Sequence, residues 1–345
     1  MYHPRLQGTH YEMGLKYGTL LYRNGIRFDN IIQLSEEQQA FGLQSLSLYH
    51  LHYPEIIDEI RGMSDGLQYP FEPFACFLLN MGVFGENYGC TCICFKDGTD
   101  LIFARNHDMF SRFKKVTESC LVRPTAGYTF VGQGDALVGK EDGVNEHGLA
   151  VGMTFVAVNH TKPGFNFLFI VRYLLEKSKN VEEAIALLHN LPICTSQNII
   201  LADRYGDMAV VECCSELIVV RKPTGEEQFL VATNHFIEPT ILKYDGKPEQ
   251  NWYLSETRYH TAQQALRMTQ NYPDSILFAQ QILSGKLGFV CQYKKELKFD
   301  SLWSFIVRLN DLTIVRSEGN PGTTKYAKDT RLTWAIKKKS NTHGK

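Results

Sequence analysis

The sequence predicts an α+β protein whose helical first quarter packs on one large structure of sheets and helices. Over residues 1–88, apolar positions recur at helical spacing and turn residues separate the segments. From Cys90 onward the pattern changes to short apolar strands separated by turns. The 345 residues contain no internal repeat and no low-complexity linker, which favours one layered structure over two separate domains.

The clearest helix of the first quarter is predicted over Pro54–Met63. Pro54 suits a first helical turn, Glu55 favours the N-terminal end, and Gly62 marks the approach to the end of the helix. A second short helix is expected over Pro73–Asn80.

A β-hairpin is predicted to begin at Cys90. Its strands are Thr91–Phe95 and Leu101–Ala104, and the dipeptide Asp97-Gly98 supplies the turn. In such a hairpin the end of the second strand returns beside the start of the first. We therefore expect Arg105 and Asp108 to lie near Cys90.

Further elements follow the hairpin. Asn180 is expected to cap a helix that includes Ala184–His189, and Ser255 to cap a helix over Glu256–Met268. The Lys-rich tail Lys337–Lys339 is expected to be solvated. Strands are predicted at Gly148–Phe155, Asn198–Asp203, Met208–Cys214, Leu217–Val220, Phe229–Thr233, Ser301–Val307 and Leu312–Val315.

Composition and charge exclude several classes of protein. With 44% hydrophobic and 21% charged residues, the chain is globular and not disordered. A net charge of −1 provides no basic field for nucleic acid or anionic lipid. Apolar runs fall short of the ~18 residues of a membrane span, so no membrane partner is expected. The N-terminus has no signal architecture, which predicts a cytoplasmic protein, and nine irregularly spaced cysteines indicate reduced thiols.

Cys90, Cys92 and Cys94 share one face of the predicted first strand. Cys92 and Cys94 are typical of a buried stripe of small residues. Three ligands on one extended strand lack the geometry of common metal sites, so no metal is expected. Cys90, flanked by a cation and a carboxylate, is the candidate nucleophile.

Six short motifs occur in an order that carries a family resemblance. They are Gln7–Gly18, Gly89–Thr91, Arg105–Asp108, Asn145–Ala150, Thr233–Asn234 and Ser255–Tyr259. In these segments the chain resembles the N-terminal-nucleophile (Ntn) hydrolases, in the branch of acyl-coenzyme A:6-aminopenicillanate acyltransferase and the choloylglycine hydrolases. The resemblance implies a four-layer αββα core with two stacked, mostly antiparallel sheets.

The resemblance also implies that the chain cuts itself between Gly89 and Cys90. Residues 1–89 would then be a helical pro-segment that becomes the small subunit, and residues 90–345 the catalytic core. An N-terminal cysteine carries its own base, because an α-amine has a pKa of about 8 and therefore exchanges protons near neutral pH. No catalytic histidine is then needed.

By the same resemblance, Cys90 is the nucleophile and Asp108 orients and charges its α-amine. Arg105 stabilises the thiolate and packs the substrate side of the site. Read from the residues alone, a structural ion pair between Arg105 and Asp108 at a strand end is an alternative.

The implied oxyanion site has two donors, the Asn234 side chain and the backbone N–H of Thr154, and Arg258 anchors the network. Without the resemblance, Asn234 could close a turn and Arg258 could lie on a helix surface. The segment Asn145–Gly148 is more typical of a turn than of a site. Thr154 stands where choloylglycine hydrolases carry an asparagine.

The leading hypothesis is an enzyme that hydrolyses or exchanges a linear C–N amide bond of an N-acylated small molecule through a Cys90 thioester. It needs no cofactor, although an acyl-coenzyme A could be a co-substrate, and a homo-oligomer is compatible with it. One alternative is a Cys–His thiol hydrolase without chain cleavage that uses His107, His147 or His235 as its base. Another is an unprocessed relative that binds acylated small molecules.

Overall fold

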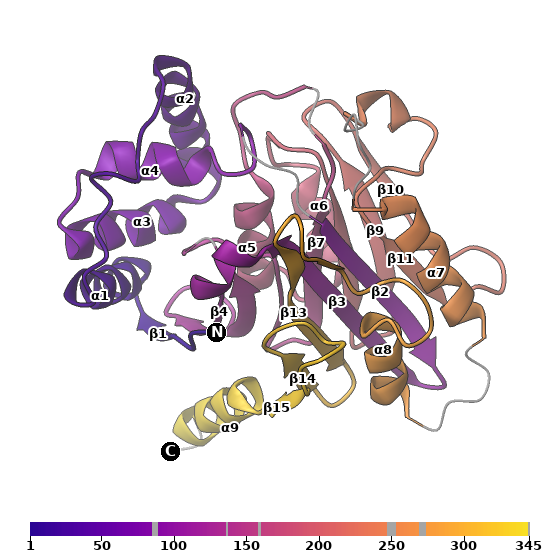
Figure 1. Ribbon diagram of the computed structural model, residues 1–345. Coiled ribbons are helices and arrows are strands. Elements are labelled where there is room, and N and C mark those ends of the chain that lie inside the picture. The colour runs from indigo at the N-terminus through magenta and orange to yellow at the C-terminus, as the bar shows by residue number, and fades with distance from the viewer. Residues whose placement is uncertain (85–88, 136, 158–159, 247–252, 269–273, 344–345) are drawn as a thin grey trace.

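A computed structural model describes residues 1–84, 89–135, 137–157, 160–246, 253–268 and 274–343. Two β-sheets face each other and helices cover both outer faces, which is the αββα arrangement expected from the family resemblance (Figure 1). Among the described residues, no helix combines the length and the apolar character needed to cross a membrane.

One sheet has eight strands, which are antiparallel except for the parallel pair β1–β4. In sheet order the strands are β1 (Arg5–Gly8), β4 (Glu118–Pro124), β5 (Phe130–Gly134), β6 (Asp142–Asn145), β7 (Leu149–Phe155), β8 (Gln197–Asp203), β9 (Met208–Cys213) and β10 (Ile218–Arg221).

The other sheet has seven strands, and all of their pairings are antiparallel. Its order is β11 (Phe229–Ala232), β2 (Gly89–Asp97), β3 (Asp100–Phe110), β13 (Phe299–Arg308), β14 (Thr313–Ser317) and β15 (Ala327–Asp329), and β12 (Tyr293–Lys294) pairs with β13.

The helices fall into three groups and a C-terminal helix (Figure 1). They are α1 (His10–Arg23), α2 (Glu36–His52), α3 (Pro54–Leu67) and α4 (Phe71–Leu79); α5 (Phe167–Lys177) and α6 (Val181–Leu188); α7 (Ser255–Arg267) and α8 (Ser275–Leu283); and α9 (Arg331–His343). Two 3₁₀ turns, Ser111–Lys115 and Leu242–Tyr244, lie in connections.

Three apolar cores hold the layers together. Between the sheets, Phe103 and Trp303 of one sheet pack in a fully buried cluster with Ile200 of the other. A second core joins α5 and α6 to the outer face of the eight-stranded sheet, and a third joins α7 and α8 to the outer face of the seven-stranded sheet. Apolar burial on both faces makes each sheet an interior layer.

The N-terminal quarter joins the core through helices and one strand. Helices α1 and α3 cross closely because Gly14 and Gly62 have no side chains; a Cβ on Gly14 would lie 1.9 Å from the Glu59 carbonyl oxygen. Tyr49 of α2 stacks on Phe165, ahead of α5, with ring centroids 3.8 Å apart. The sequence pattern indicated helix for this whole region, but Arg5–Gly8 forms β1 and extends the eight-stranded sheet.

Most predicted elements are present, with shifted ends. The helix at Pro54 continues to Leu67, and the hairpin extends to Gly89 and Phe110. The expectation that Ser255 caps α7 is wrong. Leu254 occupies the cap position in a left-handed conformation, and the Ser255 hydroxyl accepts a hydrogen bond from the Asn234 N–H at 2.7 Å.

The Lys-rich tail Lys337–Lys339 is exposed, as expected of a solvated segment. It lies in α9, and Lys339 Nζ pairs with Glu146 at 3.0 Å.

Candidate active site

The β2–β3 hairpin brings the predicted nucleophile and its neighbours together. In the register of this pair, Gly89 lies opposite Asp108 and Cys90 opposite His107. Cys90, His107 and Asp108 are fully buried. A side chain at position 89 has no room, because a Cβ there would lie 2.9 Å from the Phe299 ring and 3.1 Å from the Asp108 Cβ.

Arg105 contacts the Cys90 sulfur directly, since its Nη2 lies 3.0 Å from Sγ. Two carboxylates hold the guanidinium, Glu141 at 2.9 Å and Asp142 at 2.7 Å, and its Nε donates to the Met153 carbonyl at 2.7 Å. A buried guanidinium paired in this way keeps its charge and stabilises a thiolate at Cys90.

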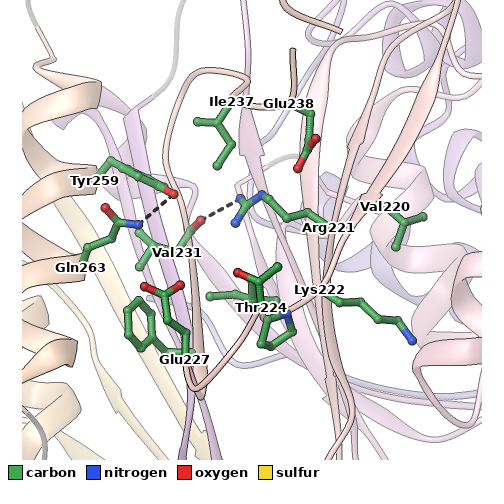
Figure 2. A pocket seen from close by; sticks show the side chains of 13 residues that line it. Val220, Arg221, Lys222, Thr224, Glu227, Val231, Ile237, Glu238, Tyr259 and Gln263 are labelled. Carbon is green, nitrogen blue, oxygen red and sulfur yellow. Dashed lines mark hydrogen bonds between the residues drawn. The ribbon is translucent and has the colours of Figure 1, made fainter. Parts of the chain in front are cut away.

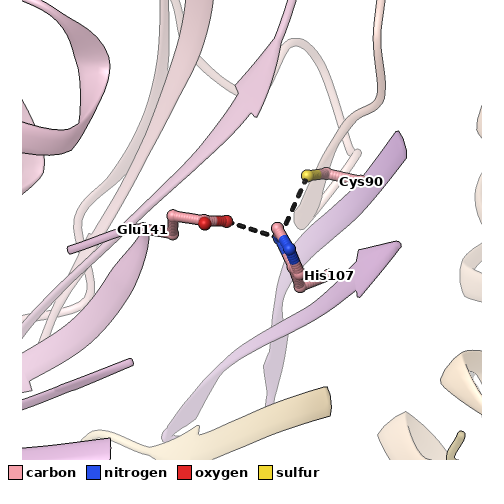
Figure 3. A group of neighbouring side chains, drawn as sticks. All are labelled: Cys90, His107 and Glu141. Carbon is pink, nitrogen blue, oxygen red and sulfur yellow. Dashed lines mark hydrogen bonds and ion pairs between the residues drawn. The ribbon is translucent and has the colours of Figure 1, made fainter. Parts of the chain in front are cut away.

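His107 lies on another side of the same sulfur, with Nδ1 4.0 Å from Sγ (Figure 3). Nδ1 also pairs closely with Glu141, and Nε2 lies 3.4 Å from Asp135. The ring stacks on Trp303, with centroids 3.9 Å apart and planes 14° from parallel. Burial alone would lower the pKa of His107, but Glu141 and Asp135 together raise it well above its ordinary value.

The backbone of Cys90 is held by two further predicted site residues. Its N–H donates to Asn234 Oδ1 at 2.8 Å, and its carbonyl accepts from Arg258 Nη1. Arg258 Nη2 also donates to Asn234 Oδ1 at 2.7 Å, while Asn234 Nδ2 donates to the Phe155 carbonyl at 2.9 Å. Because Arg258 is fully buried, it does not have the helix-surface role that the sequence left open.

Asp108 lies beside the predicted scissile bond. Its Oδ1 accepts a hydrogen bond from the Ser301 hydroxyl, and its Oδ2 lies 3.9 Å from Arg258 Nη1. Burial raises the pKa of Asp108 to about 6, against the opposing effect of Arg258 and Ser301. A proton or another cation near this carboxylate is therefore favoured.

Thr154 reaches the site through its hydroxyl, which donates to the Thr233 carbonyl. Asn198 Nδ2 donates to the same carbonyl and to Thr154 Oγ1, both at 2.9 Å. Thr154 lies opposite Asn198 of β8. Two residues further along, the Val156 N–H donates to the Ser196 carbonyl. Because the N–H groups of alternate residues point to the same neighbouring strand, the Thr154 N–H also points toward β8. In the intact chain the Thr154 N–H is thus directed into the sheet, not toward an oxyanion as the resemblance implied, and the Thr154 hydroxyl instead fixes the strand end that carries Asn234.

The three histidines considered as bases have different positions. His147 lies in a turn, packs on Tyr128 with centroids 4.3 Å apart, and is followed by Gly148 at φ +82°. His235 Nδ1 lies 2.7 Å from the Ser255 hydroxyl. Of the three, His107 is the one in contact with Cys90.

Cys90, His107 and Glu141 offer ligand atoms within 4.8 Å of one another. Arg105 Nη2 lies within 3.0 Å of both the thiol sulfur and the Glu141 carboxylate. A fixed guanidinium at that position disfavours a metal cation, and the absence of a metal stays a prediction.

A separate cavity of about 440 Å³ opens between β10, β11 and α7 (Figure 2). Arg221 and Tyr259 are among its lining residues; Cys90 and Arg105 are not. It lies along Phe229–Val231 of β11, which pair with Ile93–Phe95, beyond the part of β2 that carries Cys90.

Four side chains at the site were not predicted as site residues: Asp135, Glu141, Asp142 and Trp303. The three carboxylates reach Arg105 or His107 from the eight-stranded sheet, whereas Trp303 stacks on His107 from β13, the strand beside β3 in the same sheet. Adjacent acidic residues such as Glu141 and Asp142 are common on protein surfaces, so their spacing in the sequence gives no signal of burial.

Cys90 lies at the start of a strand in one of two stacked sheets, and helices cover the outer faces of both sheets. This arrangement is that of an Ntn hydrolase. The family model for acyl-coenzyme A:6-aminopenicillanic acid acyl-transferase matches residues 94–323. The chain belongs to this family, and the resemblance drawn from its motifs is confirmed. Membership supports amide hydrolysis or acyl transfer on N-acyl compounds.

Solved structures with a similar fold include penicillin V acylase from Agrobacterium tumefaciens, with 17% identity, a TM-score of 0.46, and coverage of 70% of this chain and 86% of that one. An N-acylethanolamine-hydrolyzing acid amidase ortholog from Caenorhabditis elegans has 18% identity, a TM-score of 0.48, and coverage of 64% and 93%. A mutant conjugated bile acid hydrolase from Clostridium perfringens has 14% identity, a TM-score of 0.49, and coverage of 70% and 96%. No curated protein matches the sequence.

Proposed function

We propose that the chain is a self-processing cysteine amidohydrolase or acyltransferase that cleaves a linear amide of an N-acylated small molecule. The observation that carries this proposal is that separate residues bind the side chain and the backbone of Cys90. Arg105 contacts its sulfur, while Asn234 and Arg258 hold its backbone N–H and carbonyl. A structural cysteine needs neither contact, whereas a nucleophile that becomes a chain terminus needs both.

In the cleaved enzyme, the Cys90 nitrogen is an α-amine next to its own thiol. The amine takes the thiol proton, and the thiolate attacks the carbonyl carbon of the substrate amide. The departing amine leaves with the proton from the Cys90 ammonium, and the acyl group stays on sulfur as a thioester. Water or a second amine then releases it.

Asn234 is the proposed side-chain donor to the oxyanion. Its Nδ2 carries two hydrogens, and the bond to the Phe155 carbonyl uses one of them. Arg258 and the Cys90 N–H both bond Oδ1, which fixes the orientation of the amide. We retain Thr154 as a site residue that positions Asn234 through the Thr233 carbonyl.

Asp108 is proposed to hold the new α-ammonium. It lies opposite Gly89 across the hairpin, and its pKa, raised by burial, falls when a cation arrives beside it. Cleavage at Gly89–Cys90 supplies such a cation. The reaction uses no cofactor in this proposal, and acyl-coenzyme A is the acyl donor only where transfer replaces hydrolysis.

The contact between Cys90 and His107 is an argument for the Cys–His alternative that the sequence did not provide. Two carboxylates, however, hold His107 in its protonated form, and an imidazolium is no base for repeated turnover near neutral pH. The α-amine mechanism is therefore the stronger proposal.

Intact-protein mass spectrometry of freshly purified protein tests the proposal. Cleavage before Cys90 divides the 39.4 kDa chain into pieces of about 10 and about 29 kDa, which remain associated through their shared core. A screen of N-acyl amino acids, penicillins and conjugated bile acids then measures amide turnover. A single 39.4 kDa species with full activity favours the Cys–His alternative, and an uncleaved inactive species favours an acyl-binding relative.

A further inference from the structure

The proposed turnover mechanism leaves the first reaction of the chain without a base. Before cleavage, the Cys90 nitrogen is part of the peptide bond to Gly89, and its N–H donates to Asn234 Oδ1. An amide nitrogen does not accept a proton near neutral pH. The thiol that cuts the Gly89–Cys90 bond must therefore be activated by another group.

Among the residues that the structure describes, two nitrogen-bearing side chains contact the Cys90 sulfur. Arg105 lies 3.0 Å away and stabilises a thiolate, but a guanidinium keeps its protons and supplies none to a departing nitrogen. His107 Nδ1 lies 4.0 Å away and belongs to a ring that gains and loses protons. His107 is thus the titratable nitrogen placed at the sulfur.

We propose that His107 is a catalytic residue of self-cleavage, whereas the Cys90 α-amine serves turnover. This inference rests on the proposed function. The Cys90 thiol loses its proton to solvent, Arg105 and the His107 imidazolium stabilise the thiolate, and the thiolate attacks the Gly89 carbonyl carbon. The C–N bond then breaks, the Cys90 nitrogen takes the proton from the imidazolium, and Gly89 remains on sulfur as a thioester. Water hydrolyses the thioester to the Gly89 carboxylate and the free Cys90 thiol.

The surroundings of His107 suit this role. Glu141 pairs with Nδ1, Asp135 lies 3.4 Å from Nε2, and Trp303 stacks on the ring and fixes its plane. The two carboxylates keep the ring protonated, so that it can donate this proton to the departing Cys90 nitrogen. Arg105 Nη2, 3.4 Å from Nδ1, adds a positive charge that stabilises the thiolate.

The two steps differ in the charge beside the sulfur. In the intact chain, Arg105 and His107 are the cations in contact with it. After cleavage, the α-ammonium of Cys90 supplies a proton that lies closer to the reacting atoms. His107 is no longer the proton donor at that point, so its loss affects cleavage more than turnover.

The test compares full-length wild type, His107→Gln, Asp135→Asn and the control His147→Gln, each made by cell-free synthesis at fixed pH. The appearance of the two fragments is followed by mass spectrometry. We expect His107→Gln to cleave about 10²-fold more slowly, the usual contribution of general acid–base catalysis. Asp135→Asn is expected to cleave at an intermediate rate, and His147→Gln at the wild-type rate.

Amide turnover per cleaved chain is then measured for each variant. We expect the kcat/KM of cleaved His107→Gln to fall much less than its rate of cleavage, because the α-ammonium of Cys90 supplies the proton during turnover. Cleavage of His107→Gln at the wild-type rate overturns the inference, as does an equal loss in both reactions. Should His107→Gln fail to fold, wild-type cleavage by folded Asp135→Asn overturns it instead.

The two proposals fail separately. If wild type cleaves and turns over amides but His107→Gln cleaves normally, the proposed function stands and only the role of His107 falls. If wild type neither cleaves nor turns over amides, both proposals fall.

Discussion

The backbone N–H of Cys90 donates to the side-chain oxygen of Asn234 at 2.8 Å, although 144 positions separate the two residues. The contact exists because β11, which ends just before Asn234, pairs with β2 on the side away from β3. Arg258 completes the arrangement by bonding both Asn234 Oδ1 and the Cys90 carbonyl. The order of strands in one sheet thus assembles three distant motifs around one peptide group.

Cys90→Ala is expected to abolish both chain cleavage and amide turnover, because it removes the nucleophile of both reactions. Cys92→Ala and Cys94→Ala should retain both. Their thiols are fully buried, and burial raises the pKa of Cys94 to about 12, so neither is a thiolate at neutral pH. Each should lower the free energy of unfolding by about 1 kcal/mol, as measured in urea. Loss of activity in a folded Cys94→Ala protein would reopen the assignment of the nucleophile.

Asn234→Ala is expected to lower kcat by about 10²- to 10³-fold with a smaller change in KM, the usual effect of removing one oxyanion donor. The same substitution also removes the acceptor of the Cys90 N–H, so chain cleavage should slow as well. Steady-state kinetics on the best substrate, normalised to cleaved protein, measures the first effect. An enzyme within about threefold of wild type would identify Asn234 as a turn residue.

The sequence predicts the local part of this site well. The turn at Asp97-Gly98 fixes the register of the β2–β3 hairpin, so the placement of Arg105 and Asp108 near Cys90 follows from spacing alone. Trp303 lies opposite His107 because β13 pairs with β3, and Glu141, which precedes β6, reaches His107 through the packing of the two sheets. Such long-range contacts leave no periodic signal.

Two further features, a short strand and a helix start, differ from the sequence prediction because contacts with distant parts of the chain determine them. The strand Arg5–Gly8 has four residues and forms only because β4 pairs with it. Ser255 has a residue type typical of a helix cap, but its hydroxyl bonds the Asn234 backbone instead. In both cases a partner far along the chain overrides the local preference.

Glu176→Gln is expected to destabilise the contact between the N-terminal quarter and α5. Glu176 pairs with Arg172 at 2.5 Å and with His10 of α1 at 2.9 Å, and Arg172 also pairs with Glu59 of α3 at 2.7 Å. Burial opposes ionisation of Glu176, but Arg172 and His10 lower its pKa to about 2. Breaking such a buried network should cost about 3 kcal/mol at pH 7.

The pH dependence of this effect has a definite sign. A carboxyl with a lowered pKa contributes stability above its unfolded value, near 4.5, and loses it as the pH falls toward about 2. Urea unfolding of wild type and Glu176→Gln should therefore differ most at neutral pH and converge in acid. The exposed Glu182 provides a matched control, since Glu182→Gln should leave stability unchanged. A constant difference across this pH range would exclude the ion pair as its cause.

The last prediction concerns Asp108 and the pH dependence of turnover. In the intact chain, burial raises the pKa of Asp108 to about 6, so the carboxylate forms as the pH rises through that value. After cleavage, the neighbouring α-ammonium lowers this pKa, and the acidic limb of kcat/KM should fall at or below about pH 6. A second rise in kcat/KM, at higher pH, should report the coupled titration of the Cys90 thiol and α-amine. Asp108→Asn should remove the acidic limb, shift the second rise, and lower the rate.

Substitution of His107, His147 or His235 by Gln should leave the shape of this profile unchanged once each protein is cleaved. His147 and His235 bond other groups, and His107 is held as an imidazolium by Glu141 and Asp135. The measurement is kcat/KM against pH for wild type and the four variants, with cleavage confirmed by mass. A profile that follows one histidine and ignores Asp108 would transfer the role of base from the Cys90 amine to that histidine.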